Sequence, residues 1–242
     1  MLHTKITPPY FELGPKNYMI DRTVEKLAYT VRAAAEKYNI RAIYSAPFIH
    51  LERIGEAFEG SEHCYVFAPY MDDLPPDSKA GSALPERLKA CGVQGVYINH
   101  SSLPQTLGAM IRMQARAEKL GLYTMACADS IKEIQATAII GPDILIAEPE
   151  DLIGSGQSAD AAYIQASIAA AHAINPEVSV LIGAGISSGE DVYKCIYNGA
   201  DATGSASGIF KSDNPEAMIY EMFEAVRCGW DDRHKTAQKE RK

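Results

Sequence analysis

The stretch DILIAEPEDLIGSG, residues 143–156, runs from an apolar segment directly into an acidic residue and then into glycines. Glu148 follows the apolar run, Pro149 comes next, and the first glycine, Gly154, is six residues beyond Glu148. A buried strand that ends in a carboxylate and a glycine-containing loop is compatible with two structures. One is a turn with a solvated acid, and the other is a catalytic base under a closing loop. The stretch alone leaves both open.

The same order, a short β-rich run followed by a helical segment, recurs along the chain. Strict alternation predicts parallel strands, because parallel neighbours need a long return connection. Eight such units over residues 1–230 predict an α/β fold of the (β/α)8 barrel type. A doubly wound open sheet is the alternative, but it would usually carry GxGxxG after the first strand, and none is present. The expected strands cover residues 10–13, 41–47, 64–69, 95–100, 122–128, 143–149, 178–185 and 200–206.

The helical segments between these runs have apolar residues at intervals of three and four, as in residues 21–39. Asn214 and Pro215 are a cap and a first-turn proline, and they predict the start of the last helix. No linker rich in Pro, Gly or Ser divides the chain, so residues 1–230 are interpreted as a single barrel domain. Residues 231–242 are highly charged and are expected to form a C-terminal extension, either a frayed helix or a disordered tail.

Composition excludes several classes of partner. The 242 residues carry a formal net charge of −8, which argues against nucleic acid or an anionic membrane as a partner. No signal peptide or membrane-length apolar run is present, so a cytoplasmic protein is expected. The five cysteines have no CxxC spacing, which favours reduced thiols over disulfides or a zinc site. The histidines also lack metal-ligand spacing, so neither a metal nor another cofactor is expected.

Candidate chemistry gathers where the expected strands end, which is the face that holds the active site in barrels of this kind. Lys16, His100, Cys127 and Glu148 lie at these ends, together with the loops GAGISSG (183–189) and GSASG (204–208). Taken singly, these residues also fit ordinary roles: a solvated rim acid, a structural histidine, a surface lysine, and a turn that caps a helix. Their joint placement favours proton transfer beside a phosphate group.

This combination has a chemical logic. A carboxylate can take a proton from carbon and return it to the adjacent carbon. A neutral imidazole and an ammonium group can stabilise the oxygens of the enediolate that forms. Backbone N–H groups at glycine-flanked turns and helix starts bind phosphate, and a closing loop excludes water from the intermediate. The opening stretch is therefore interpreted as a base under a lid.

Five motifs resemble those of the triosephosphate isomerase family, especially its short archaeal-type branch: NHSS (99–102), MACA (125–128), IAEPEDLIGSG (146–156), LIGAGISSGEDV (181–192) and GSASGIFKSDNPE (204–216). The resemblance implies Glu148 as the base, His100 as the electrophile and Lys16 as the charge complement. It implies phosphate contacts at Gly154, at Ser187 or Ser188, and at Ser207 and Gly208. Asn99 and Cys127 would support the catalytic residues, with Cys127 packed beneath Glu148.

Three positions depart from the family pattern. Gly14 stands where the family has an asparagine two residues before its lysine, and Ser102 stands where it has a glutamate two residues after its histidine. The loop Ala80-Gly81-Ser82 replaces the usual threonine-glycine-glutamate. The resemblance implies a homodimer or homotetramer, although the altered loop weakens that expectation.

The favoured interpretation is an isomerase that interconverts glyceraldehyde 3-phosphate and dihydroxyacetone phosphate through a cis-enediolate. The alternative is an isomerase of a related sugar phosphate, such as a tetrulose phosphate, because the losses at Gly14 and Ser102 make room. A phosphate-binding barrel without catalysis is disfavoured because Glu148 and His100 are both present. A Schiff-base aldolase is disfavoured because a glutamate occupies the place where its lysine would stand.

Overall fold

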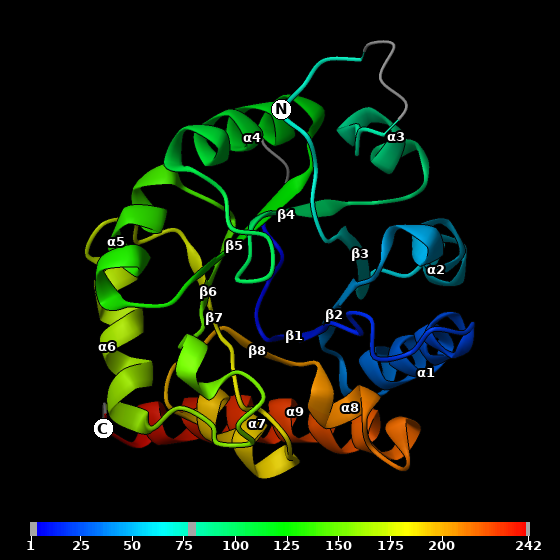
Figure 1. The fold of residues 1–242 in the computed structure, drawn as a ribbon. Coiled ribbons are helices and arrows are strands. Elements are labelled where there is room, and N and C mark those ends of the chain that lie inside the picture. The colour runs from blue at the N-terminus through cyan, green and yellow to red at the C-terminus, as the bar shows by residue number, and fades with distance from the viewer. Residues whose placement is uncertain (1–3, 77–80, 241–242) are drawn as a thin grey trace.

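The computed structural model describes residues 4–76 and 81–240 and has a closed barrel of eight parallel strands in the order in which they occur along the chain (Figure 1). The strands are β1 (Tyr10–Leu13), β2 (Arg41–Ser45), β3 (Cys64–Ala68), β4 (Gly95–Asn99), β5 (Tyr123–Ala128), β6 (Ile144–Ala147), β7 (Ser179–Ile182) and β8 (Ala202–Ser205). The barrel closes where β1 pairs with β8, with Tyr10 opposite Ala202. The α/β barrel prediction is therefore confirmed.

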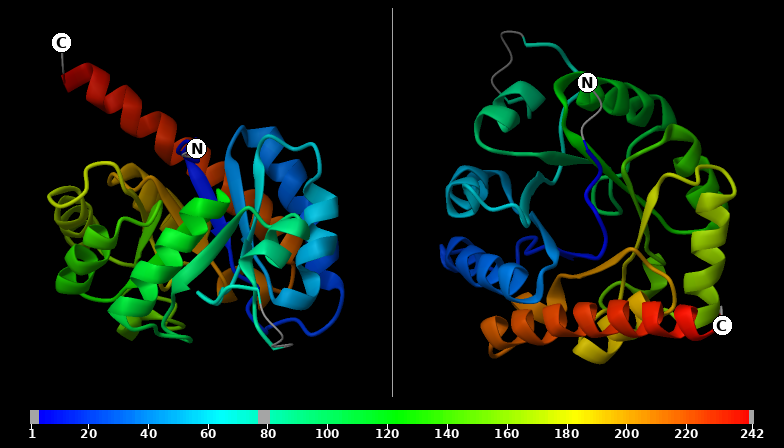
Figure 2. Two further views of the ribbon diagram at one scale, coloured as in Figure 1. Left: turned by 90° about the horizontal axis from the view of Figure 1, so that it is seen from above. Right: turned by 180° about the vertical axis from the view of Figure 1, so that it is seen from behind.

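Helices surround the strands on the outside (Figures 1 and 2). They are α1 (Thr23–Tyr38), α2 (Leu51–Phe58), α3 (Pro85–Ala90), α4 (Leu107–Leu120), α5 (Ile131–Ile140), α6 (Ala161–His172), α7 (Gly189–Tyr197), α8 (Ser207–Phe210) and α9 (Pro215–Glu240), with 3-10 turns η1 (Phe48–His50) and η2 (Glu150–Leu152). The long α9 packs against α7 and α1. Its C-terminal end projects beyond the barrel (Figure 2, left).

The alternation of side chains along each strand decides which residues enter the barrel. In β1, Phe11 and Leu13 pack in the outer layer between strands and helices, whereas Tyr10 belongs to the inner cluster. Glu12, two residues after Tyr10, therefore also points into the barrel. In β6, Ile144 and Ile146 are internal, and Glu148 continues the same inward series just past the end of the strand.

The observed elements are shorter at several ends than expected. β6 stops at Ala147 and β7 at Ile182, because the residues that follow turn into the loops of one rim. Asn214 and Pro215 begin α9 as expected, with the Asn214 side chain accepting a hydrogen bond from the N–H of Ala217. The short α8 was not expected.

The charged C-terminal segment is helical as far as Glu240, because α9 continues through it. The guanidinium of Arg233 in this segment donates hydrogen bonds to the carbonyls of Ile196 and Ala200, so the segment is attached to the barrel. Residues 241 and 242 lie outside the described residues, as does Ala80 of the altered loop. All five cysteines are free thiols. Among the described residues, no helix is long and apolar enough to cross a membrane.

Candidate active site

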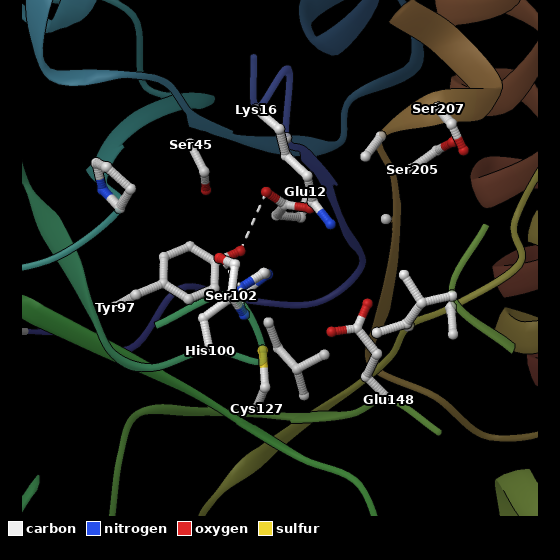
Figure 3. Close-up of a pocket in the computed structure, with 18 of the residues that line it drawn as sticks. Glu12, Lys16, Ser45, Tyr97, His100, Ser102, Cys127, Glu148, Ser205 and Ser207 are labelled. Atoms are coloured by element: carbon white, nitrogen blue, oxygen red, sulfur yellow. Dashed lines mark hydrogen bonds between the residues drawn. The ribbon is translucent and has the colours of Figure 1, made fainter. Parts of the chain in front are cut away.

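One cavity of about 640 Å³ opens at the C-terminal ends of the strands (Figure 3). Lys16, His100, Cys127 and Glu148 all line it, although they come from four different segments of the chain. One ligand-type atom from each of His100, Cys127 and Glu148 lies within 4.8 Å of the others. The expectation that strand ends bring these residues together in space is therefore met, while their catalytic roles stay predictions.

Glu148 is held in place by its backbone and is largely buried. Its N–H donates to the carbonyl of Ala128 at 2.9 Å, which continues the β5–β6 pairing by one residue. Gly183 gives its side chain room, since a Cβ there would lie 3.3 Å from the Cβ of Glu148. Burial raises the pKa of Glu148, and the Lys16 charge and the Cys127 thiol offset only part of this rise. A carboxylate made more basic in this way is better suited to remove a proton from carbon.

His100 carries a neutral ring whose tautomer follows from its hydrogen bonds. Its Nδ1 accepts the backbone N–H of Ser102 at 3.0 Å and lies 2.7 Å from the Ser102 hydroxyl. Because Nδ1 is an acceptor, the ring proton is on Nε2 and can be donated to a ligand. Burial, together with the Lys16 charge, lowers the pKa of His100 to about 4, so the ring is neutral at physiological pH. The serine that replaces the family's glutamate thus fixes the histidine.

Lys16 follows β1 in a tight turn in which the N–H of Tyr18 donates to the carbonyl of Pro15. Its φ of 47° lies in the left-handed region, which is uncommon for a residue with a side chain. The ammonium group lowers the pKa of Glu148 and that of His100, so its charge acts on both proposed reacting groups. Figure 3 shows the lysine reaching into the same space as these side chains.

The expected phosphate contacts separate into two groups. Gly154 and Ser207 line the cavity, whereas Ser187, Ser188 and Gly208 are not among its lining residues. The hydroxyls of Ser187 and Ser188 both bond to Asp191, and Ser188 with Asp191 forms the capping box of α7. The side chains of these two serines are therefore bonded at the N-terminus of α7, and the preceding residues, Gly185 and Ile186, line the cavity.

Gly208 has a packing role. A Cβ at this position would lie 2.6 Å from the carbonyl oxygen of Ile186 and 2.7 Å from Ser205 Oγ, so only glycine lets the two loops meet. The Ser205 hydroxyl, which sequence reasoning did not single out, donates to the same Ile186 carbonyl at 2.8 Å. In the described part of the chain, no hydrogen bond is formed by the N–H of Gly185 or of Ser207, and both residues line the cavity. These groups are available to an anion.

The segment expected to act as a lid touches the loop that follows β7 directly. Gly185, with φ of 69°, approaches residue Gln157 so closely that a Cβ would lie 1.9 Å from its carbonyl oxygen. Gly154 and Gly156, at the tip of the segment, have φ of 73° and 71° and open space around them. The segment is therefore anchored at one end and has glycine joints at its tip.

Cys127 and Asn99 connect the ends of β4 and β5. The Asn99 amide donates to the Cys127 carbonyl at 2.8 Å and accepts the N–H of Gln105 at 3.0 Å. Burial, with the negative charge of Glu148, raises the pKa of the Cys127 thiol well above its usual value, which disfavours a thiolate nucleophile. His100, Cys127 and Glu148 have the donor types of a transition-metal site, but a thiol that retains its proton is a poor ligand.

Sequence reasoning missed Glu12, the second carboxyl group of the cavity. It is 8% exposed, and its Oε1 accepts a hydrogen bond from the Tyr97 hydroxyl at 3.2 Å. Burial raises the pKa of Glu12 to about 7, although the nearby hydroxyls of Ser45 and Tyr97 and the Lys16 charge act in the opposite direction. The available signal was a lone acid in the apolar run YFEL, an even number of residues from Tyr10.

A basic carboxyl group, a neutral imidazole and a lysine around one cavity of a (β/α)8 barrel define the class of isomerases that move a proton between adjacent carbons. Comparison with known proteins agrees with this class. The family model described as triosephosphate isomerase matches residues 15–222. The chain belongs to the triosephosphate isomerase family, whose enzymes act on a phosphorylated sugar.

Similar proteins include archaeal enzymes named triosephosphate isomerase. That of Methanocaldococcus jannaschii is 32% identical over 204 residues, which cover 83% of this chain and 91% of the relative. That of Sulfurisphaera tokodaii is 32% identical over 208 residues, covering 85% and 86%. That of Methanoculleus marisnigri is 38% identical over 160 residues, covering 65% and 72%. The resemblance to the archaeal branch is thereby confirmed.

Proposed function

We propose that this protein is an aldose–ketose isomerase of small sugar phosphates that interconverts glyceraldehyde 3-phosphate and dihydroxyacetone phosphate through a cis-enediolate. The observation that carries the proposal is the convergence of Glu148, with a raised pKa, and a neutral His100 on one cavity. Membership of the triosephosphate isomerase family supports the same reaction.

In this reaction Glu148 takes a proton from the carbon next to the carbonyl group, and the electrons of the C–H bond form the C=C bond of the enediolate. The Nε2–H of His100 donates to the enediolate oxygens, and the Lys16 ammonium balances their negative charge. Glu148 then returns the proton to the neighbouring carbon. A hydroxyl proton moves between the two oxygens, so atoms and electrons balance without an external oxidant.

The phosphate group is proposed to bind at the backbone N–H groups of Gly185 and Ser207, with Gly154 closing over it. A dianion is held well by several N–H groups in a glycine-flanked turn. Closure of the segment around Gly154 would keep water from the enediolate, which otherwise eliminates its phosphate.

The test is a coupled assay in which purified protein receives glyceraldehyde 3-phosphate and the formation of dihydroxyacetone phosphate is followed. The Glu148→Gln variant keeps the shape of the side chain but cannot take the proton, so kcat should fall by a factor of about 100 or more. Inhibition by inorganic phosphate should be retained and would show that the variant is folded. Normal turnover by the variant would mean that the base is elsewhere.

A second candidate, an isomerase of a four-carbon sugar phosphate, is favoured by one observation. Glu12 adds a polar group to the cavity next to Gly14, the position at which the family pattern has an asparagine. In a triose phosphate, the oxygens on the two reacting carbons meet His100 and Lys16, so no further hydroxyl is left to bind Glu12. The same assay with a tetrulose phosphate separates the two candidates.

A further inference from the structure

Glu12 has an unused hydrogen-bonding capacity directed at the cavity. Its Oε1 accepts the Tyr97 hydroxyl, and the Ser45 hydroxyl lies close enough to lower the pKa of the same carboxyl group. The two carboxylate oxygens together can accept about four hydrogen bonds, so acceptor capacity remains on the cavity side. Buried carboxyl oxygens are normally paired with protein groups or with water, because desolvation of an unpaired oxygen costs about 1–3 kcal/mol or more. A carboxyl group that lines a cavity and has acceptor capacity left over from its protein partners is placed to meet a ligand.

The chain makes room for this carboxyl group at two glycines. A Cβ at Gly204 would lie 2.8 Å from Glu12 Oε2, and one at Gly14 would lie 3.2 Å from Oε1. The two glycines flank the group from β8 and from the turn after β1. The space vacated at Gly14 is therefore occupied by Glu12, which corrects the expectation that the loss simply enlarges the cavity.

A second polar group lies beside the carboxyl group. Ser45 Oγ, at the end of β2, is buried without a hydrogen-bond partner among the described residues. It is close enough to Glu12 to influence the carboxyl group, and both residues line the cavity. Tyr97 completes the set, with its ring against that of His100 at a centroid distance of 5.6 Å.

The location of this set relative to the phosphate-facing loops is clear in Figure 3. Ser45 and Tyr97 lie on one side of Glu12, and Ser205 and Ser207 lie on the other. A substrate whose phosphate sits at the Ser207 side and whose reacting carbons lie near His100 has its remote end near Ser45 and Tyr97.

We propose that Glu12, Ser45 and Tyr97 form a hydroxyl-binding subsite for a hydroxymethyl group on the reacting carbon remote from the phosphate. The preferred substrate is then a tetrulose 1-phosphate. The same proton transfer, from C3 to C2, converts it to the tetrulose 4-phosphate, so this reaction interconverts two ketoses, and a triose phosphate is turned over less efficiently. A hydroxymethyl group donates one hydrogen bond, which the Glu12 carboxylate can accept, and accepts others, one of which the Ser45 hydroxyl can donate. The Tyr97 hydroxyl already donates to Glu12 and holds the carboxyl group in place. A site built to bond a hydroxyl discriminates strongly against the analogue that lacks it.

The inference rests on the proposed isomerase function, and its test measures both together. The kcat/KM values for dihydroxyacetone phosphate and for each enantiomer of erythrulose 1-phosphate are determined by NMR for the wild type, Glu12→Gln and Ser45→Ala. Glu52→Gln, at an exposed position of α2, is the matched control for loss of one carboxylate. Inhibition by inorganic phosphate checks that each variant is folded.

We expect the wild type to favour one erythrulose 1-phosphate over the triose by about tenfold or more. Glu12→Gln should reduce this preference by about tenfold and Ser45→Ala by about threefold, while Glu52→Gln leaves it unchanged. A wild type that favours the triose, or variants that slow both substrates equally, would overturn the subsite. If the wild type turns over neither substrate, or if Glu148→Gln turns over both normally, the proposed function itself is wrong.

Discussion

The pH dependence of folding stability gives a quantitative test of the buried Glu12. Burial, partly offset by Ser45, Tyr97 and Lys16, raises its pKa from 4.5 to about 7, and the negative charge of Glu148 adds to the rise. Between these values the folded protein holds a proton that the unfolded chain releases. The stabilisation is therefore complete below pH 4.5 and is lost as the pH rises through about 7. At about 1.4 kcal/mol per pKa unit, the loss amounts to about 3 kcal/mol.

Glu12→Gln isolates this contribution, because glutamine is neutral at every pH. Urea unfolding of the wild type and of the variant is measured from pH 4.5 to pH 8, and the two free energies of unfolding are subtracted at each pH. The wild type should lose about 3 kcal/mol relative to the variant across this range. Glu148 also has a raised pKa but is present in both proteins, so most of its contribution cancels. If the free energies of unfolding of the two proteins varied with pH in parallel, the raised pKa of Glu12 would be refuted.

Three further predictions concern the rim. Burial and the Lys16 charge lower the pKa of His100 to about 4, so its ring should remain neutral, with the proton on Nε2, from pH 5.5 to pH 8. Nitrogen NMR spectra measure this directly, and an imidazolium signal at pH 6 would contradict it. Lys16→Ala should raise the pKa of His100 and slow turnover about tenfold or more, and unchanged kinetics would exclude the lysine from the site. Gly185→Ala should lower the free energy of unfolding by about 1–3 kcal/mol and weaken phosphate inhibition, because the added Cβ would collide with Gln157. The control Gly108→Ala, on α4, should have neither effect.

The fold could be predicted from sequence because alternation and length both indicate one architecture. Eight β-rich runs separated by helical segments have few other solutions, and all eight strands are present. The strand ends were less predictable. The run 178–185 is apolar apart from Ser179 and has glycines at 183 and 185, yet only Ser179–Ile182 forms β7, because the residues that follow turn into a loop of the rim. At the end of a strand, whether a residue continues the hydrogen-bonded pairing or enters the loop depends on where the neighbouring strands end.

The position of the catalytic candidates was predictable for the same reason as the fold. Residues that follow parallel strands meet at one rim, so Lys16, His100 and Glu148 could be brought together from their places in the sequence. The contacts that hold these residues in place were harder to predict. Ser102 was interpreted as the loss of a carboxylate, but its backbone N–H and hydroxyl fix the His100 ring, a contact that requires the path of the loop.

Two features of the rim were only partly predictable. Either Ser187 or Ser188 was expected to contact phosphate, which stays a prediction, and in the structure the carboxylate of Asp191 accepts hydrogen bonds from both hydroxyls. The serine followed three residues later by an acid is a capping signal that was available in the sequence. Glu12 was missed because a charged residue in a short apolar strand can face either way, and only the inward series that includes Tyr10 decides its direction.

The most direct test of the central claim, that Glu148 moves the proton between carbons, is solvent exchange. Glyceraldehyde 3-phosphate is incubated with the protein in D2O, and deuterium at carbon is followed by proton NMR in the wild type and in Glu148→Gln. The account predicts rapid incorporation by the wild type and a rate lower by a factor of about 100 or more in the variant, with phosphate inhibition retained. Equal rates of incorporation in the two proteins would contradict it.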